Sequence, residues 1–519
     1  MVYVRLRAWS VVVVLLLCGP VLVCAQGWSE PAIDGSLRSA PLDPPPVTGT
    51  TFYVDINSMG GTCNNSNAGT SPSAPWCTLT KALQTLTAGQ LALVRTGTYN
   101  NGNIRPTNSG TPGNYITFRA YPGNTPVINC SGQTFCFDGN AALAKSYIVF
   151  DGFEIANPVQ QYMVCRGQQG CHHWWFVNNK VHNNGATFDG FVMGGHHLVF
   201  SNNEIYNTGR EGLITLVPPD TGNNIILEFN HVHDNGRNAD DAGGLKCGDV
   251  DAFNCIMRYN VVHDNYRNPG SSFPCFNPGQ CQGVTGLYID RGRDTEFGGM
   301  SYIYNNIVFN NDIGIQAYDT HGVRIFNNII YENGFTPGAG IFIWHFSAGI
   351  AVGDSNSNTH IYNNTIIGNA GRGIDLWNIG ANAVTMTNNI VQGNVLGQMY
   401  YFGGQTNFTS NYNLVAAAGG GPQFDWNGTT YTLTSFKARS GNTMELNSQG
   451  SSATFVNAAT DDYHLTTGSV GKDQGTTIAL FSYDKDNVTR PQNSVWDIGA
   501  YEFGAGVTLI APTNLRIVP

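Results

Sequence analysis

The sequence predicts an all-β protein of the solenoid class, a parallel β-helix, and three observations lead to this fold. Glycine makes up 63 of 519 residues and charged residues only 12%, where about 7% glycine and about 25% charged residues are usual. Long surface helices need more Lys, Glu and Arg than this, while an aromatic content of 11% argues against a disordered chain. Two short strand-like phrases also alternate along the chain, each at a fixed place in a repeat, which is the signature of a solenoid.

The first phrase is centred on asparagine and the second begins with glycine. The asparagine phrase recurs at 176–184, 200–207, 228–235, 258–265, 303–311, 325–333, 361–369 and 386–394. The glycine phrase starts at Gly212, Gly244, Gly286, Gly314, Gly340 and Gly373. Asparagine suits the turns of a parallel β-helix because it tolerates left-handed backbone and can pair its amide with the next coil. Leucine-rich and helical repeats would need a Leu lattice or a 3.6-residue period, and a β-sandwich with Asn-Gly hairpins would not repeat so regularly.

The N-terminus has the pattern of a secretory signal peptide. Arg5 and Arg7 precede an apolar run over 8–23, and small residues around Ala25 offer a cleavage site, so we expect 1–25 to be removed and 26–50, which is rich in proline, to be a linker. The apolar run is short for a membrane anchor, and we expect no membrane insertion. The net charge of -10 argues against nucleic acid as a partner, because a nucleic-acid binder needs a basic face.

The cysteines indicate an oxidising compartment. The ten that follow the expected cleavage site fall into neighbouring pairs, which predicts local disulfides rather than zinc sites, whose paired cysteines are usually two residues apart. The expected pairs are Cys63–Cys77, Cys130–Cys136, Cys165–Cys171, Cys247–Cys255 and Cys275–Cys281.

The two ends of the repeat region resemble those of a known superfamily. The opening over 52–102 and the ending over 462–503 are similar to those of secreted right-handed parallel β-helix proteins of the pectate-lyase-like superfamily. This resemblance implies a right-handed solenoid over 51–415 with a short N-terminal capping helix at Leu79–Leu86, and a C-terminal closing segment over 416–503. Residues 504–519 are then a tail. The superfamily hosts lyases, hydrolases, epimerases and binders, so the resemblance predicts fold and compartment better than reaction.

Period-2 alternation within the glycine phrases sorts side chains into core and outer face. The first and third positions after each glycine are mostly apolar and should face inward. The second and fourth should face outward, where stacking about 4.8 Å apart would align them in one stripe. This outer stripe would contain Lys246, Gly248, Tyr288, Asp290, Gln316, Tyr318, Phe342, Trp344, Asp375 and Trp377.

Aromatic side chains are unusually frequent in this outer stripe. A solvated β-face should carry Thr, Ser, Lys and Asn, whereas rows of exposed rings suit the C–H faces of sugars. We therefore expect a carbohydrate-binding surface formed by Asp290, Gln316, Tyr318, Phe342, Trp344, His345, Asp375 and Trp377. The alternative is that a long segment, at 267–284 or 345–360, covers these rings as a satellite core.

The densest ionisable patch lies on the coils of Gly244 and Gly286. In lyases that the chain resembles, the polymer contains uronic acids and a Lys or Arg base removes the C5 proton after a cation or Arg neutralises the carboxylate. The resemblance thus implies Lys246 as base, Arg291 as neutralising cation and Tyr288 as acid for the leaving group. Each could instead be structural, with Lys246 solvated and Arg291 paired to a neighbouring carboxylate.

Four carboxylates flank Lys246 and predict a candidate calcium site, because Ca²⁺ prefers oxygen ligands and two adjacent loops supply them. The expected ligands are Asp240, Asp241, Asp249 and Asp251, although the first two also suit turns.

The sequence leaves the reaction open. We expect a monomer that acts on an acidic polysaccharide, most simply as a lyase. An inverting glycoside hydrolase would use carboxylates such as Asp290, Asp319 and Asp375. A C5-epimerase and a non-catalytic polysaccharide-binding protein are also compatible with the residues of this face.

Overall fold

The computed structural model describes residues 40–504 apart from a set of short internal gaps. The gaps are 101–103, 139–144, 166–170, 216–223, 269–270, 272–273, 275–280, 282, 293–298, 335–347, 354–355, 357, 378–383, 403–407, 418, 420 and 442. The expected signal peptide, most of the expected linker and almost all of the expected tail lie outside the described residues.

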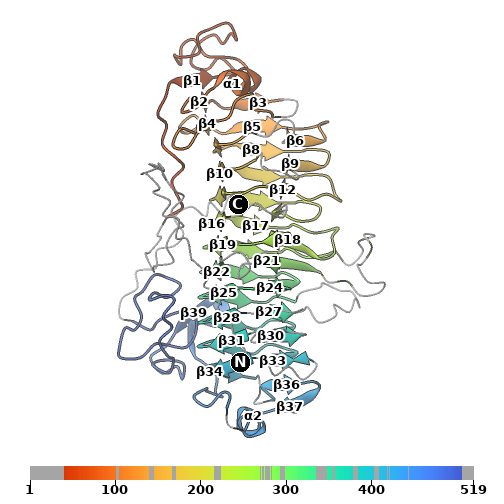
Figure 1. Ribbon diagram of the computed structural model, residues 1–519, viewed down its shortest axis with the longest axis vertical. Helices are drawn as coiled ribbons and strands as arrows, with labels where there is room; N and C mark the ends of the chain where they lie inside the picture. Colours follow the sequence, from red (N-terminus) through yellow and green to blue (C-terminus); the bar gives the residue numbers. More distant parts are fainter. Residues whose placement is uncertain are drawn as a thin grey trace, which may run out of the picture.

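The described chain winds into an elongated stack of coils with three parallel sheets along its length (Figure 1). From Ile116 onward, each coil contributes one strand to sheet A, one to sheet B and one to sheet C, in that order along the sequence. Strands of successive coils pair in parallel and in register, as Leu245 with Leu287 in sheet C. This confirms the predicted all-β parallel solenoid.

The strand bounds follow for each sheet within the described residues. Sheet A contains β1 Thr51–Val54, β2 Leu91–Val94, β4 Ile116–Ala120, β7 Ile148–Asp151, β10 Trp174–Val177, β13 Leu198–Ser201, β16 Ile225–Glu228, β19 Cys255–Arg258, β22 Ser301–Tyr304, β25 Val323–Phe326, β28 Thr359–Tyr362, β31 Val384–Thr387 and β34 Phe408–Asn411. Sheet B contains β3 Gly97–Tyr99, β5 Pro126–Asn129, β8 Glu154–Ala156, β11 Lys180–His182, β14 Glu204–Tyr206, β17 His231–His233, β20 Val261–His263, β23 Ile307–Phe309, β26 Ile329–Tyr331, β29 Thr365–Ile367, β32 Ile390–Gln392 and β35 Leu414–Ala416. Sheet C contains β6 Phe135–Asp138, β9 Gln161–Cys165, β12 Phe191–Met193, β15 Leu213–Thr215, β18 Ala242–Ala252, β21 Val284–Gly292, β24 Ile313–Tyr318, β27 Ala348–Gly353, β30 Arg372–Trp377, β33 Gly397–Tyr401, β36 Phe424–Trp426 and the antiparallel β37 Thr429–Tyr431.

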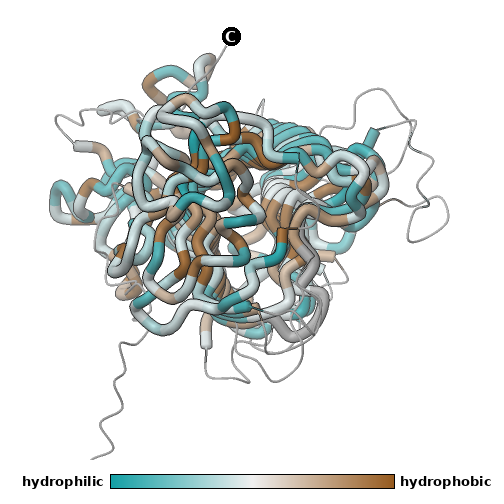
Figure 2. Tube along the Cα trace, turned by 90° about the horizontal axis from the view of Figure 1, so that it is seen from above, coloured by the Kyte–Doolittle hydropathy of each residue, from teal (hydrophilic) through white to brown (hydrophobic). Residues whose placement is uncertain are grey.

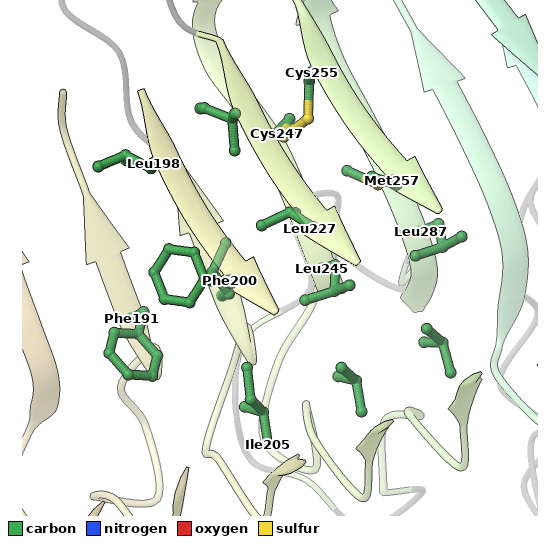
Figure 3. Close-up of a cluster of buried hydrophobic side chains, with 14 of the residues drawn as sticks. Phe191, Leu198, Phe200, Ile205, Leu227, Leu245, Cys247, Cys255, Met257 and Leu287 are labelled. Carbon is green, nitrogen blue, oxygen red and sulfur yellow. A yellow bond between two sulfur atoms is a disulfide. The ribbon is translucent and has the colours of Figure 1, made fainter. Parts of the chain in front are cut away.

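Apolar side chains from all three sheets fill the centre of the coils. Seen along the axis, the hydrophobic residues gather inside the tube (Figure 2). Figure 3 shows one section, where Phe200 and Leu227 of sheet A lie near Leu245 and Leu287 of sheet C. These side chains are fully buried, and burying apolar surface stabilises the fold by about 25 cal/mol per Å². They belong to one hydrophobic cluster that is continuous along the stack.

Two ladders of buried asparagines turn the corners between sheets, as predicted. At the corner between sheets A and B, each side-chain amide donates to the amide oxygen of the next coil, for example Asn260 to Asn306 at 3.0 Å and Asn306 to Asn328 at 2.9 Å. The same amides also donate to backbone carbonyls of the preceding coil. A second ladder at the corner between sheets B and C includes Asn235, Asn265, Asn311, Asn333, Asn369 and Asn394. The ladders satisfy corner groups that would otherwise be buried without partners.

Both ends of the stack are closed by a short helix. Helix α1, Leu79–Thr85, begins at Thr78, whose hydroxyl accepts from the backbone N–H of Lys81, and it confirms the predicted N-terminal cap. Helix α2, Leu433–Arg439, follows the last strands of sheet C and begins at Thr432 with a reciprocal capping box.

The chain after α2 returns along the outside of the stack, where it includes β38 Phe455–Asn457, a single 3₁₀ turn at Ala458–Thr460, and β39 Asp462–Leu465. The Phe481 ring stacks on Phe326 of sheet A at 4.5 Å, and Tyr463 contacts Tyr331 of sheet B. At the other end of the described chain, the backbone N–H of Leu42 donates to Glu228 on the outer face of sheet A. The outer faces of sheets A and B are thus partly covered by the chain's own terminal segments.

Disulfides join the predicted neighbours. Three predicted bonds are present in the described residues, Cys63–Cys77, Cys130–Cys136 and Cys247–Cys255. Cys171 and Cys281 are also disulfide-bonded. Within the described part of the chain, no helix is both long and apolar enough to cross a membrane.

One coil was assigned to the wrong phrase from the sequence. The strand that follows β24 in sheet C is β27, whose Ile350 and Val352 face the core and whose Ala351 and Gly353 take the outer positions. The prediction had given these outer positions to Phe342 and Trp344, which lie outside the described residues together with His345. Two glycine-initiated apolar phrases lie a few residues apart here, at Gly340 and Gly349, and alternation alone does not distinguish them.

Candidate functional site

The outer face of sheet C carries the predicted stripe, but its central members are buried. The parallel register places Lys246 beside Tyr288, Tyr288 beside Gln316, and Asp290 beside Tyr318. The direction of these side chains is therefore as predicted. Their exposure is not, because Lys246 and Tyr288 are each only 2% exposed. For these residues the alternative of a covered outer face holds.

Lys246 lies at the centre of this face, in contact with groups from the next coil. Its ammonium pairs with Asp290 Oδ2 at 2.9 Å and lies over the Tyr288 ring, 4.6 Å from the centroid. Gly248 allows the backbones of β18 and β21 to lie close together beside Asp290. A Cβ there would lie 1.9 Å from the Asp290 carbonyl oxygen, and the glycine adopts a φ of 136°, which other residues rarely do.

Tyr288 links the Lys246 coil to the turn that precedes it. Its hydroxyl donates to Asp241 Oδ1 at 3.3 Å. Burial raises the pKa of the Tyr288 phenol well above its ordinary value, and the negative charges of Asp241 and Asp290 raise it further. At neutral pH the phenol is therefore protonated and able to donate.

Two acids that the sequence analysis missed extend the cluster toward the N-terminus. Asp189 and Glu211 lie on the two coils before Lys246, each directly before the glycine of its coil, and both are buried. Burial, and then the charge of Asp189 and its hydrogen bond, raise the pKa of Glu211 well above the ordinary value, against the opposing charges of Arg210 and Lys246. Arg210 lies 3.3 Å from Asp189 Oδ1. An acidic residue immediately before the glycine was the signal that could have found them.

Arg291 and the predicted calcium ligands are distributed around this cluster. Arg291 is exposed, next to Asp290 on β21, and has a left-handed φ of 52°. Asp240 is buried and its Oδ1 accepts from the backbone N–H of Gly283 at 3.3 Å. The side chains of Asp249 and Asp251, on β18, are not among those described.

The remaining predicted residues lie farther along the same face. Tyr318 and Trp377 are half-buried and their rings are 5.6 Å apart. They meet across the coil between them because that coil has Gly353, where a Cβ would lie 2.0 Å from the Trp377 ring. The hydroxyl of Thr285 donates to Gln316 at 2.7 Å.

Asp375 forms a second acidic position on this face. It is 0% exposed, and burial raises its pKa to about 7 despite Arg372, whose Nη1 donates to Asp375 Oδ2 at 2.7 Å. Asp290 and Asp375 are three coils apart in the register, or about 14 Å at the usual strand spacing. This is beyond the roughly 6.5–9.5 Å of an inverting carboxylate pair, so Asp290 and Asp375 do not form such a pair with each other.

Oxygen donors suited to calcium lie at the Asp189–Glu211 pair. Asp189 Oδ1 and Glu211 Oε2 are buried and accept no hydrogen bond within the described residues, although the Arg210 guanidinium pairs with both carboxylates, at 3.3 and 3.8 Å. Hard carboxylate oxygens are the ligands that Ca²⁺ takes. In the described part of the chain, however, three or more metal-binding side chains converge only in two histidine-containing groups. The pair supplies two carboxylates, fewer than the three ligands of either histidine group, so a calcium ion stays a prediction.

Comparison with known proteins confirms the kind of fold. The model described as "Pel9A-like, right handed beta helix region" matches residues 59–210, and the model "Right handed beta helix region" matches 280–457. No curated protein sequence matches the chain. The two matched regions identify the fold as a right-handed parallel β-helix, the handedness that the resemblance of the two ends implied.

Several solved structures are similar to this chain at low sequence identity. The crystal structure of pectate lyase Pel9A is 18% identical over 88% of this chain and 98% of that chain, with a TM-score of 0.47. XylC in complex with xylose is 12% identical over 72% and 86%, with a TM-score of 0.51. The GH136 lacto-N-biosidase from Eubacterium ramulus is 12% identical over 73% and 65%, with a TM-score of 0.47.

Proposed function

We propose that the protein is a secreted polysaccharide lyase that cleaves a uronic-acid-containing polymer by β-elimination at the outer face of sheet C. The observation that carries this proposal is Lys246, a buried lysine held between the carboxylate of Asp290 and the ring of Tyr288. Burying an ammonium is costly for folding even when a carboxylate such as Asp290 balances its charge.

Two further observations support a polysaccharide substrate. The half-buried rings of Tyr318 and Trp377 lie along the same face, and such rings stack on sugar C–H faces. The matched family model takes its description from Pel9A, and a solved protein of that name is a pectate lyase. The disulfides support an oxidising compartment.

The proposed reaction uses two groups of adjacent coils. Lys246 first passes one proton of its ammonium to Asp290 Oδ2, 2.9 Å away, and its neutral Nζ then accepts the proton at C5 of a uronate. The C5–H electrons form the C4–C5 double bond, and the C4–O bond breaks. The Tyr288 hydroxyl donates its proton to the leaving oxygen, so one proton moves to the lysine and one leaves the tyrosine. Arg291, exposed at the end of β21, pairs with the uronate carboxylate and makes the C5 proton more acidic. Because Lys246 is buried, the residues that cover it must move when the polymer binds.

Asp189 and Glu211 would hold a calcium ion in this proposal. Such an ion would supply positive charge that lowers the pKa of the C5 proton by binding the uronate carboxylate. It would also remove the proton that the Glu211 carboxyl keeps in its absence.

A screen of acidic polysaccharides tests the reaction class. Elimination leaves an unsaturated uronate, whose conjugated double bond absorbs ultraviolet light, whereas hydrolysis leaves only new reducing ends. We expect absorbance and reducing ends to rise together on at least one uronic-acid polymer. Reducing ends without absorbance would reject the lyase, and binding without either signal would indicate a non-catalytic polysaccharide-binding protein.

A second candidate function rests on Asp375. Asp375, Tyr400 and Asp425 occupy successive coils in register, so the two carboxylates are about 10 Å apart along the stack, close to the separation of an inverting hydrolase. With a pKa of about 7, Asp375 would be the general acid and half-buried Asp425 the base. A hydrolase would form reducing ends without ultraviolet product, and loss of these reducing ends in a folded Asp375→Asn variant would assign hydrolysis to this pair.

A further inference from the structure

Four histidines form a compact group at the corner between sheets C and A, away from the Lys246 cluster. His172 and His173 precede β10, and His196 and His197 precede β13 on the next coil. The two dipeptides repeat the same geometry, because His173 and His197 both have left-handed φ angles, 60° and 58°. A positive φ is uncommon for residues other than glycine, although histidine, like Asn and Asp, adopts it more often than most.

The imidazole nitrogens of this group face one another. His172 Nδ1 lies 2.7 Å from His173 Nδ1, and His196 Nδ1 lies 2.6 Å from His197 Nδ1. Donor nitrogens of His173, His196 and His197 all lie within 4.8 Å of one another. Two nitrogens at hydrogen-bonding distance share one proton, and a metal ion can replace that proton. In a tetrahedral site with bonds of about 2.0–2.1 Å, ligand nitrogens are about 3.3 Å apart, so small ring movements suffice.

Neighbouring side chains hold these rings in place. His173 stacks on His197 at 4.4 Å and His172 on His196 at 4.9 Å. Tyr147 stacks on the other side of His173, also at 4.4 Å. The amide of Asn224 contacts His197 Nε2 at 3.2 Å, an outer contact of the kind that orients metal-ligating imidazoles.

The surroundings of these histidines disfavour protonation of their rings. Burial, and then the neighbouring histidines, lower the pKa of His173 to about 3 and that of His197 to about 4. Both imidazoles are therefore neutral at physiological pH, the form that binds metals.

We propose that His173, His196 and His197 bind one divalent late transition-metal ion, for which Zn²⁺ is the natural probe, with the fourth position taken by water or His172. Imidazole donors select zinc, copper or nickel rather than calcium, so this site differs in chemistry from the acidic pair. It lies two coils before Lys246, about 10 Å along the stack. An ion there would join two successive coils beside the buried disulfide of Cys171.

The chain contains a matched control in a second histidine group. Glu204, His231 and His233 also bring three potential ligand atoms together. There, however, His233 lies 2.8 Å from Asp234 and 3.4 Å from Glu204, and hydrogen bonds to these carboxylates outweigh burial and raise its pKa to about 9. Both ring nitrogens of His233 are thus already engaged with carboxylates, so a metal ion would have to break one of these pairs.

The test is zinc binding by the chelator-stripped full chain, measured by calorimetry and by metal content after dialysis. We expect one Zn²⁺ per chain, a higher Tm with zinc, and at least a 100-fold loss of affinity in His173→Asn/His197→Asn, since asparagine accepts the left-handed backbone. His231→Asn/His233→Asn should bind as the wild type does. The proposal is overturned if the stripped wild type binds no zinc, or if only the second variant loses it.

Cobalt in the wild-type protein gives a reading that does not depend on any variant folding. Co²⁺ bound by three imidazoles and water in a tetrahedron should give strong visible absorption, which Zn²⁺ displaces. Weak octahedral absorption, or none, would contradict the site.

Discussion

The two faces of sheet C follow different rules although the same strands form them. On the inner face, Leu245, Leu287 and Ile315 continue one apolar column through successive coils. On the outer face, the neighbouring column runs Lys246, Tyr288, Gln316. Both columns are buried, but the inner one is stabilised by packing alone and the outer one by ion pairs and hydrogen bonds. A buried polar side chain must keep its hydrogen-bond or ion-pair partners. Fewer substitutions should therefore be tolerated at a buried polar position of the outer face than at an apolar position of the inner face.

The largest effect should come from placing a charge on the inner face. Leu287→Asp buries a carboxylate among apolar side chains, and we expect a loss of more than about 4 kcal/mol of unfolding free energy or no folded protein. Tyr318→Asp, on the half-buried outer face of the next coil, should cost much less. Urea unfolding followed by circular dichroism measures both, and equal losses would remove the distinction between the faces.

The Lys246–Asp290 pair tests the outer face. Asp290→Ala removes the carboxylate that balances a buried ammonium, and we expect a cost of about 3 kcal/mol. The double variant Lys246→Met/Asp290→Leu should recover much of this loss, because apolar side chains replace both charges. A double-mutant cycle in urea measures the coupling, and strictly additive losses would mean that the pair is not coupled.

The corner ladders should show an intermediate sensitivity. Asn306→Leu interrupts the amide chain between Asn260 and Asn328 and should cost about 2 kcal/mol. Asn310→Gly is the control, because glycine accepts the left-handed φ of 52° at that position. If the two variants unfold at the same urea concentration, the ladder does not stabilise the corners.

The smallest effect should be a gain in stability from Glu211→Gln. The folded-state pKa of Glu211 is raised, so its proton stabilises the fold below the unfolded pKa and this contribution is lost as the pH rises. Glutamine keeps a neutral side chain at every pH. We expect Tm at pH 8 to rise by about 2–4 °C and to change little at pH 4. A Tm that falls equally at both pH values would contradict the raised pKa.

Most of the fold was predictable because it depends on local, repeated patterns. Alternation correctly placed Leu245, Cys247 and Ile289 in the core, and the asparagine phrases correctly predicted the ladders. The spacing of cysteines predicted the three disulfides seen in full. To predict these features it is enough to know which residues of a strand face inward, or which conformation a turn adopts.

The site was less predictable because burial on the outer face depends on segments distant in sequence. Alternation gave the direction of Lys246 and Tyr288 but not their burial. Asp189 and Glu211 escaped notice because each lies just before a glycine, outside the counted positions. The coil with Ala351 and Gly353 was missed because a similar phrase precedes it. The roles of Lys246, Arg291, Tyr288 and the predicted calcium ligands remain proposals.

The most direct test of the proposed catalytic face is the rate of Lys246→Ala on the polymer that the screen identifies, compared with wild type under saturating substrate. We expect the ultraviolet signal to fall by about 10³-fold, while circular dichroism and polymer binding are retained and Arg291→Ala weakens binding. A Lys246→Ala protein that folds, binds polymer and forms unsaturated product at the wild-type rate would contradict the assignment of this face as the catalytic site.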